Sequence, residues 1–137
     1  MKKTLFSAFV ACMAFCSCTN ENGTGNTAEP DVIGKWAIIE ANGLSTDSAE
    51  TKPFIEFCDS GMVNGHASVN TFFGQYTING DSIFFNQMGV TTMMGHDMEV
   101  ETAILTAIAQ CATLELQDSL LCAKDHDGNV VLSMKRN

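Results

Sequence analysis

Residues 75–86 read Gln-Tyr-Thr-Ile-Asn-Gly-Asp-Ser-Ile-Phe-Phe-Asn, and this stretch carries the strongest short hairpin signal in the chain. Two strand candidates, residues 75–78 and 82–86, flank the pair Asn79-Gly80. Asparagine and glycine tolerate the positive φ that a tight hairpin turn demands. The stretch therefore predicts two antiparallel strands joined by a short turn, with an antiparallel sheet as the framework of the protein.

Further strand candidates lie on both sides of this hairpin and are separated by turn residues such as Asn42-Gly43 and Asp118-Ser119. They cover residues 35–40, 53–58, 62–67, 113–117, 120–123 and 130–134.

One helix is predicted near residues 97–110. Its first turn is acidic, with Asp97, Glu99 and Glu101, which complements the positive end of the helix dipole. An apolar stripe follows at helical spacing, made of Ile104, Leu105, Ile108 and Cys111. Strands, then one helix, then more strands predict an α+β domain: a mostly antiparallel sheet, barrel-like or strongly curved, with one packed helix.

The first residues have the pattern of an export signal. Lys2 and Lys3 precede an apolar run from Leu5 to Cys16, and Ser17-Cys18 follows. The run is shorter than the roughly 20 residues of a membrane-spanning helix. A cysteine at the cut resembles the lipobox of bacterial lipoproteins, which implies cleavage before Cys18 and lipid attachment to it. A cleaved signal without lipid is the alternative, and Cys12 and Cys16 are competing cut sites.

Three segments are expected: a lipoprotein signal peptide over residues 1–17, a flexible tether over 18–30 and one folded domain over 31–137. The tether is predicted because residues 19–30 contain no large apolar side chain. Cleavage leaves five basic residues against 16 acidic ones, a net charge of −11. This charge disfavours binding to nucleic acid. It also disfavours contact with anionic lipid headgroups, so membrane contact is expected through the lipid and not through the domain surface.

Cysteine spacing gives no redox or zinc motif. If Cys18 carries lipid, Cys58, Cys111 and Cys122 remain, so at most one disulfide can form. Buried free thiols are the expectation. The chain also has no G-x-S-x-G motif and no Gly-rich phosphate loop, so we expect no catalytic residues, no cofactor and no enzyme activity.

Two polar or sulfur-rich segments could hold a metal. Met88, Met93, Met94, His96 and Met98 fall close together, and thioether with imidazole ligands suits Cu(I). The other interpretation is that these methionines fill core gaps beside the helix. Residues 125–129 begin like a calcium loop, but Arg136 stands where the closing glutamate would be required, which favours a polar turn between strands.

Four motifs occur in order along the domain. They are a G-x-W strand at residues 34–36, a segment at 65–76 related to G-x-x-G-C-N-x-x-x-G-x-Y, a T-x-M-x-C-like piece at 91–95, and E-x-x-φ-L-x-x-L at 101–108. Together they resemble the META domain, the family of the heat shock protein HslJ. The resemblance covers nearly all of residues 33–135.

The resemblance implies a mostly antiparallel β domain with one helix, in an envelope or secreted protein associated with stress and antibiotic tolerance. It carries over Trp36, Asn70, Gly74, Tyr76 and Glu101 as motif positions with structural roles. If Glu101 is buried, it must be hydrogen-bonded or protonated. The family glycine is Ser68 here, and the two family cysteines are Val69 and Gly95, so any disulfide between those positions is absent.

These observations predict a lipid-anchored protein of the bacterial cell envelope. Thr19 lacks the aspartate associated with inner-membrane retention, which favours the outer membrane. The META-like domain is expected to act as a non-enzymatic binding or stress-response module, with another envelope protein as its partner. The alternative function is a metal or small-ligand binder that uses Met93, Met94, His96 and Met98.

Overall fold

The computed structural model describes residues 29–137. The predicted signal peptide, Cys18 and most of the tether lie outside the described residues. The elements are β1 (Gly34–Ala41), β2 (Leu44–Ser45), β3 (Phe54–Phe57), β4 (Met62–His66), β5 (Thr71–Asn79), β6 (Ser82–Val90), α1 (Met98–Gln110), β7 (Thr113–Gln117), β8 (Leu120–Lys124) and β9 (Val130–Arg136).

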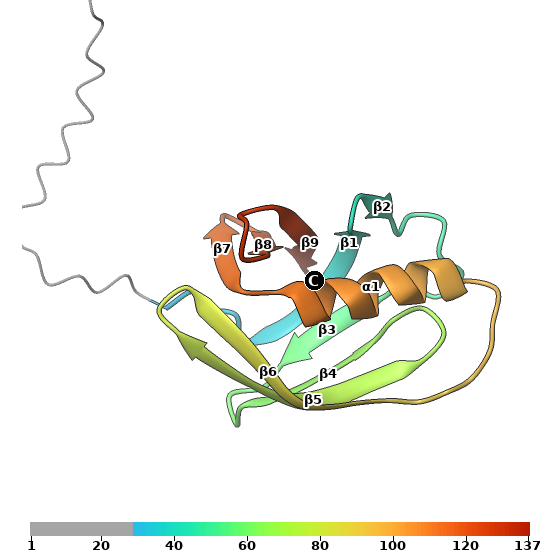
Figure 1. Cartoon of the computed structure of the whole chain (residues 1–137), viewed down its shortest axis with the longest axis horizontal. Coiled ribbons are helices and arrows are strands. Elements are labelled where there is room, and N and C mark those ends of the chain that lie inside the picture. The colour runs from blue at the N-terminus through green and yellow to red at the C-terminus, as the bar shows by residue number, and fades with distance from the viewer. Residues whose placement is uncertain (1–28) are drawn as a thin grey trace, which may run out of the picture.

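The strands form a closed antiparallel barrel with one helix (Figure 1). Eight strands follow the order β1-β3-β4-β5-β6-β7-β8-β9, and β9 pairs with β1 to close the ring. The two-residue β2 extends the far end of β1. The predicted barrel-like antiparallel sheet with one packed helix is therefore confirmed.

The β5–β6 hairpin forms, but its turn is one residue away from the prediction. Asn79 pairs with Ser82, so Gly80 and Asp81 are the central residues of the turn. Gly80 has φ of 64°, which fits a turn with glycine at the first central position. Asn79 is thus the last ladder residue of β5.

A two-residue Asn-Gly turn with two positive φ angles occurs between β1 and β2. Asn42 has φ of 47° and Gly43 has φ of 80°, and they connect β1 to β2. Asparagine and glycine are the residues that such a turn favours.

Both strands of the long hairpin extend further than the predicted segments. The extension of β6 places Met88 in a strand, where Gly74 of β5 makes room for it: a Cβ on Gly74 would lie 2.4 Å from the Met88 sulfur. The ladder shifts register between Phe73 and Gln75, and Gln87 on β6 has φ of 50°. Such a bulge bends the strand.

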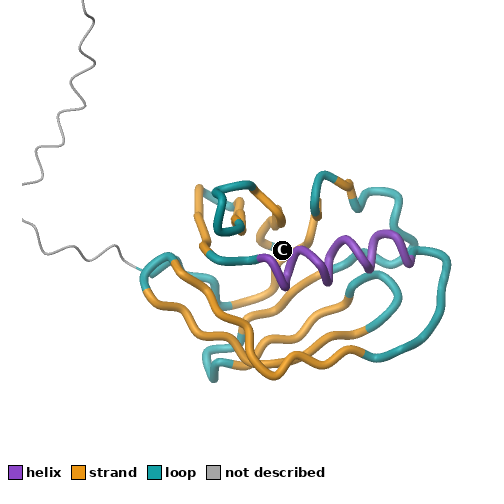
Figure 2. Tube along the Cα trace, viewed as in Figure 1, coloured by secondary structure: helices purple, strands orange, loops and turns teal. Residues whose placement is uncertain are grey.

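The interior of the barrel is filled by side chains. Trp36, Ile55, Phe72 and Leu121 are each fully buried. Burying a large apolar side chain contributes about 1.5–3 kcal/mol. Figure 2 shows α1 crossing between the strands β3–β6 and the strands β7–β9.

The buried face of α1 is rotated from the predicted stripe. Its buried residues are Val100, Glu101, Ile104, Ala107 and Ile108. Leu105 and Cys111 are only half-buried and pack at the edge of the core. The predicted stripe is therefore correct for Ile104 and Ile108 but too far to one side for the other two.

Within residues 29–137, no helix is long and apolar enough to cross a membrane. The three cysteines of the described domain, Cys58, Cys111 and Cys122, are free and half-buried. The expectation of free thiols is confirmed for these three, although none is fully buried.

Candidate functional site

Three segments meet around Asn70 at one end of the β5–β6 ribbon. They are the turn at residues 67–70 after β4, the loop at residues 91–97 after β6 (here called the Met loop), and the first turns of α1. Asn70 is 1% exposed and Glu101 is 4% exposed. Two strongly polar side chains are thus buried side by side, and each needs partners.

Asn70 uses every hydrogen-bonding group that it has. Its side-chain amide donates to the Met93 carbonyl at 2.8 Å and to Glu101 Oε1 at 2.7 Å. Its side-chain oxygen accepts from the Met93 N–H at 2.6 Å and the Thr91 hydroxyl at 2.9 Å. Its backbone N–H donates to Glu101 Oε2 at 2.8 Å, and its carbonyl accepts from Ala67 at 2.8 Å. Asn70 therefore fixes the backbone of the Met loop.

Glu101 orients Asn70. Its two carboxylate oxygens each accept one hydrogen bond from Asn70, one from the backbone and one from the side chain. Such hydrogen bonds to a charged acceptor are stronger than neutral ones. The helix position explains the burial, since Glu101 lies three residues before Ile104 on the face that packs into the barrel. The expectation that a buried Glu101 is hydrogen-bonded is met.

Asp97 secures the other end of the Met loop. It stands at the N-cap of α1, but its side chain makes no capping bond to the helix. Asp97 Oδ2 instead accepts from the Ser68 hydroxyl at 3.0 Å and from the Glu50 N–H at 2.8 Å. Ser68 has φ of 87°, a conformation that favours glycine, at the position where the related motif has glycine.

Val69 and Gly95 lie in contact across this cluster. A Cβ added to Gly95 would lie 3.6 Å from the Cβ of Val69 and 2.9 Å from one of its methyl groups. Disulfide-linked cysteines have Cβ atoms about 3.5–4.5 Å apart. Val69 and Gly95, which stand where the family motif has its two cysteines, are therefore neighbours at a distance that a disulfide could span.

The other motif positions have separate structural roles. The fully buried Trp36 donates from its indole nitrogen to the Val32 carbonyl at 2.7 Å. Tyr76 packs edge-on against Phe57 and donates to the Cys58 carbonyl at 2.7 Å. Burial, together with nearby Cys58 and Asp59, raises the pKa of Tyr76 above its ordinary value.

The predicted metal-binding residues are mostly exposed. Met93 is 63% exposed and Met94 is 85% exposed; His96 is exposed and Met98 is half-buried. The core-filling interpretation is therefore right for Met88, which packs against the core, and wrong for Met93 and Met94. In residues 29–137 no group of three or more His, Cys, Asp or Glu side chains could hold a metal ion.

Residues 125–129 form the predicted polar turn between β8 and β9. Asp125 Oδ1 accepts from the backbone of Asp127 at 3.0 Å and of Asn129 at 2.9 Å. These hydrogen bonds, with that from Asn129 strongest, lower the pKa of Asp125.

A model of a known protein family matches nearly all of the described chain. The match is to the META domain, over residues 31–137. The chain belongs to the META domain family. No curated protein matches the chain in sequence.

Solved structures of low sequence identity share the fold of this META domain. A protein solved by NMR has a TM-score of 0.61 at 19% identity, over 76% of this chain and 89% of that chain. A DUF4847 family protein from Bacteroides vulgatus has a TM-score of 0.59 at 11% identity, over 77% of this chain and 94% of that chain. A protein from Burkholderia xenovorans has a TM-score of 0.58 at 18% identity, over 76% of this chain and 81% of that chain.

The sequence motifs include Asn70 and Glu101 but do not indicate that the two side chains pair. Thr91, Ser68 and Asp97 were not predicted as members of the cluster. Thr91 opens the T-x-M-x-C-like motif, so its motif position was the available signal. Asp97 carries no such signal, because an acidic residue at a helix start is already explained by the dipole.

Proposed function

We propose that this META domain protein is a lipoprotein of the bacterial cell envelope, anchored through Cys18 in the outer membrane, and that its barrel is a non-enzymatic binding module of the envelope stress response. The observation that carries the binding role is the Met loop. Asn70 holds its backbone in place, while Met93 and Met94 are exposed. A fixed loop loses little conformational freedom on binding, and methionine adapts to varied apolar surfaces.

The position of the Met loop supports presentation to a partner away from the membrane. Glu29 and Pro30, where the tether joins the domain, lie in one surface pocket with Asp81 of the β5–β6 turn. The Met loop begins at the other end of the same ribbon, after Val90. A nine-residue strand spans roughly 30 Å, so the tether attaches at one end of the ribbon and the loop extends from the other (Figure 1).

Anchoring is tested by replacing single cysteines of the export segment. We expect Cys18→Ser to abolish lipid attachment and sedimentation with membranes, with Cys16→Ser as the matched control that leaves both intact. Intact-mass spectrometry of the mature protein reads the cut site and the acyl groups. Unchanged processing and membrane sedimentation of Cys18→Ser would refute the anchor.

Binding through the Met loop is tested by photo-crosslinking in cells. A photoreactive residue at Met94 should give one discrete adduct with an envelope protein, and the same residue at exposed Asp127 in the β8–β9 turn should not. Equal adducts from both positions, or none from Met94, would argue against the loop as the contact surface.

A second candidate function is Cu(I) binding by the same loop. It is favoured by the exposure of two thioethers and one imidazole within four residues, Met93 to His96. Titration with Cu(I) against a competing chromophoric chelator should show binding that Met94→Leu with His96→Ala removes. Met62→Leu, an exposed methionine outside the loop, is the control. A flat titration ends this candidate.

A further inference from the structure

The joint between β6 and β7 is the narrowest in the barrel of the described chain. The two strands share one ladder pair, Ser82 with Thr113. Two further backbone bonds flank it, from Ile83 N–H to the Ala112 carbonyl at 3.0 Å and from Leu114 N–H to the Asp81 carbonyl at 2.7 Å. Beyond Ile83, β6 pairs with β5 on one side only.

The unpaired side of β6 has free backbone groups. Backbone groups alternate direction along an antiparallel strand. Ile83 donates away from β5, to Ala112, so the N–H and C=O of Phe85 face the same way. The described residues place no strand opposite them. An edge of this kind is a template for another strand.

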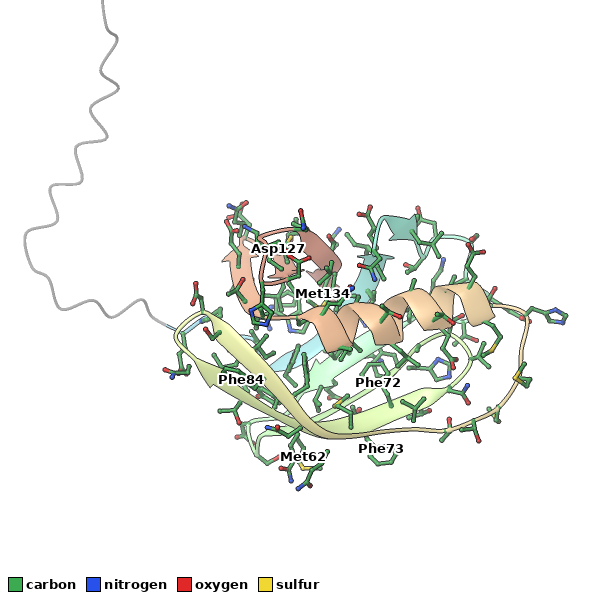
Figure 3. The ribbon with its side chains drawn as sticks, in the orientation of Figure 1. Met62, Phe72, Phe73, Phe84, Asp127 and Met134 are labelled. Carbon is green, nitrogen blue, oxygen red and sulfur yellow. The ribbon has the colours of Figure 1, made fainter. Side chains whose placement is uncertain are left out.

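An apolar groove of about 420 Å³ runs along this edge, between β6 and α1. Its walls are Phe84, Phe85, Met88 and Val90 with Ile83 on one side, and Leu105, Ile108, Ala109 and Cys111 on the other. Phe84 is 57% exposed, and Figure 3 shows it on the β5–β6 hairpin. None of the lining residues is charged, in a chain whose formal net charge is −9.

The occupant that fits is an extended, uncharged strand with large apolar side chains. The chain's own tether does not fit, since residues 19–28 contain no large apolar residue. β6 itself does fit: residues 82–90 contain two phenylalanines, isoleucine, methionine and valine, with no charge and no proline. Natural edge strands are usually blocked by such charges or prolines, and β6 carries only the bulge at Gln87.

We propose that the β6 edge is a self-association surface, on which a second copy of this chain pairs its own β6 antiparallel about a two-fold axis. The pairing uses only the free stretch of each β6 beyond Ile83, because residues 81–83 are already bonded to the segment at 112–114. Phe85 of each copy therefore bonds to the part of the partner's β6 beyond its bulge at Gln87, and Phe84 enters the partner's groove. A two-fold axis places the same patch on both copies. The acidic residue nearest the edge, Asp81, then lies at opposite ends of the joint and faces no like charge.

Sedimentation velocity of residues 29–137, which contain the whole closed barrel and its core, tests this proposal. We expect a reversible monomer–dimer equilibrium at micromolar concentrations and above. The dimer should strengthen as salt screens the acidic bodies. Hydrogen exchange of the Phe85 amide should slow as protein concentration rises, while the already bonded Ile83 amide should not change.

Two matched substitutions locate the interface. Phe84→Lys should raise the dimer dissociation constant at least about tenfold, because it places a charge in the groove. Phe73→Lys changes a phenylalanine of similar exposure, 51% against 57%, on the outer face of β5 and should leave the constant unchanged. A chain that stays monomeric to millimolar concentration overturns the proposal. So does a dimer that Phe84→Lys leaves intact, or that Phe73→Lys weakens as much.

Discussion

The cluster around Asn70 and the outer edge of β6 are parts of the same two-stranded ribbon, yet they treat hydrogen bonding in opposite ways. At the cluster, one side chain satisfies two backbone groups of the Met loop and is itself held by a buried carboxylate. At the edge, a run of backbone beyond Ile83 pairs on one side only. Buried polar side chains thus fix one loop of this barrel, while one edge of β6 keeps unpaired backbone groups.

The largest effect is expected from removing the Asn70 side chain. Asn70→Ala leaves the buried Glu101 carboxylate without its side-chain partner and frees both Met93 backbone groups. Leaving a buried polar group without its hydrogen-bond partner costs about 1–3 kcal/mol, and more for a charged group, so we expect a loss of about 3 kcal/mol. Urea unfolding measures the free-energy change.

Two controls give that prediction its meaning. Asn64→Ala, on the half-buried side of β4, removes only a long contact of 3.8 Å to the Cys58 sulfur and should cost under about 1 kcal/mol. The double variant Asn70→Ala with Glu101→Ala should cost less than the sum of the single changes, since the two side chains act as one unit. Additive losses would contradict the coupling.

The next effect is a gain in stability at the same cluster. Val69→Cys with Gly95→Cys should form a disulfide, because the two Cβ positions lie 3.6 Å apart and Gly95 does not need a left-handed φ. Disulfides typically stabilise by about 2–4 kcal/mol. The measurement is the unfolding midpoint of the oxidised double variant against its reduced form. Failure of the pair to oxidise would mean that the loop is not held where the structure places it.

A smaller effect is expected for the reactivity of Cys111, which lines the apolar groove between β6 and α1. Burial raises the pKa of this thiol to about 12, and its S–H donates to the Ala107 carbonyl at 3.2 Å. At pH 8 it should react with a thiol reagent at least about tenfold more slowly than Cys58 or Cys122, since the thiolate is the nucleophile. Single-cysteine variants of residues 29–137 separate the three rates.

The sign of the pH dependence follows from the same shift. The folded state holds the Cys111 proton more tightly than the unfolded state, whose pKa is near the ordinary value of 9.0. This stabilisation is complete below about pH 9 and is lost as the pH rises toward 12. Cys111→Ala should flatten the alkaline loss of stability, and an unchanged alkaline profile would argue against a buried thiol.

The smallest effect is expected for Phe84→Lys in the monomer. The side chain is mostly exposed, so the free energy of unfolding at low protein concentration should change by no more than about 0.5 kcal/mol. Phe72→Ala, at a fully buried position on β5, should cost about 3–5 kcal/mol by the same chemical denaturation. A large loss for Phe84→Lys would mean that the edge is covered within the monomer.

The amino-acid sequence predicts the barrel-like sheet and its helix because those features depend on local patterns. One pattern can serve several structures, as the three Asn-Gly pairs of the domain illustrate, and only the turn predicted at Asn79-Gly80 is misplaced. Asn42-Gly43 forms the two-residue turn, and Asn79-Gly80 is shifted from its turn by one residue. Gly65 of the third pair lies inside β4, where a Cβ would meet the Phe54 carbonyl oxygen and the Phe72 ring, each at 2.3 Å.

The candidate site depends on long-range contacts that periodicity does not encode. Asn70 and Glu101 are 31 residues apart, and Ser68 and Asp97 are 29 apart. The META motif order names Asn70 and Glu101 without saying that they touch. The composition of the Met loop is compatible with filling the core and with facing solvent. The hydrogen bonds from Asn70 turn the Met93 carbonyl and N–H inward.

Hydrogen exchange at the Met93 amide, in wild-type protein and in Glu101→Ala, tests most directly whether Glu101 and Asn70 together fix the Met loop. Glu101 makes no hydrogen bond to Met93 among the described residues; it acts on Met93 through Asn70. We expect a protected Met93 amide in the wild type and markedly faster exchange in the variant. The Ala112 amide, bonded to Lys124 on the β7–β8 side, should be less affected. A Met93 amide that exchanges like free peptide in the wild type, or at the same rate in both proteins, would contradict this expectation.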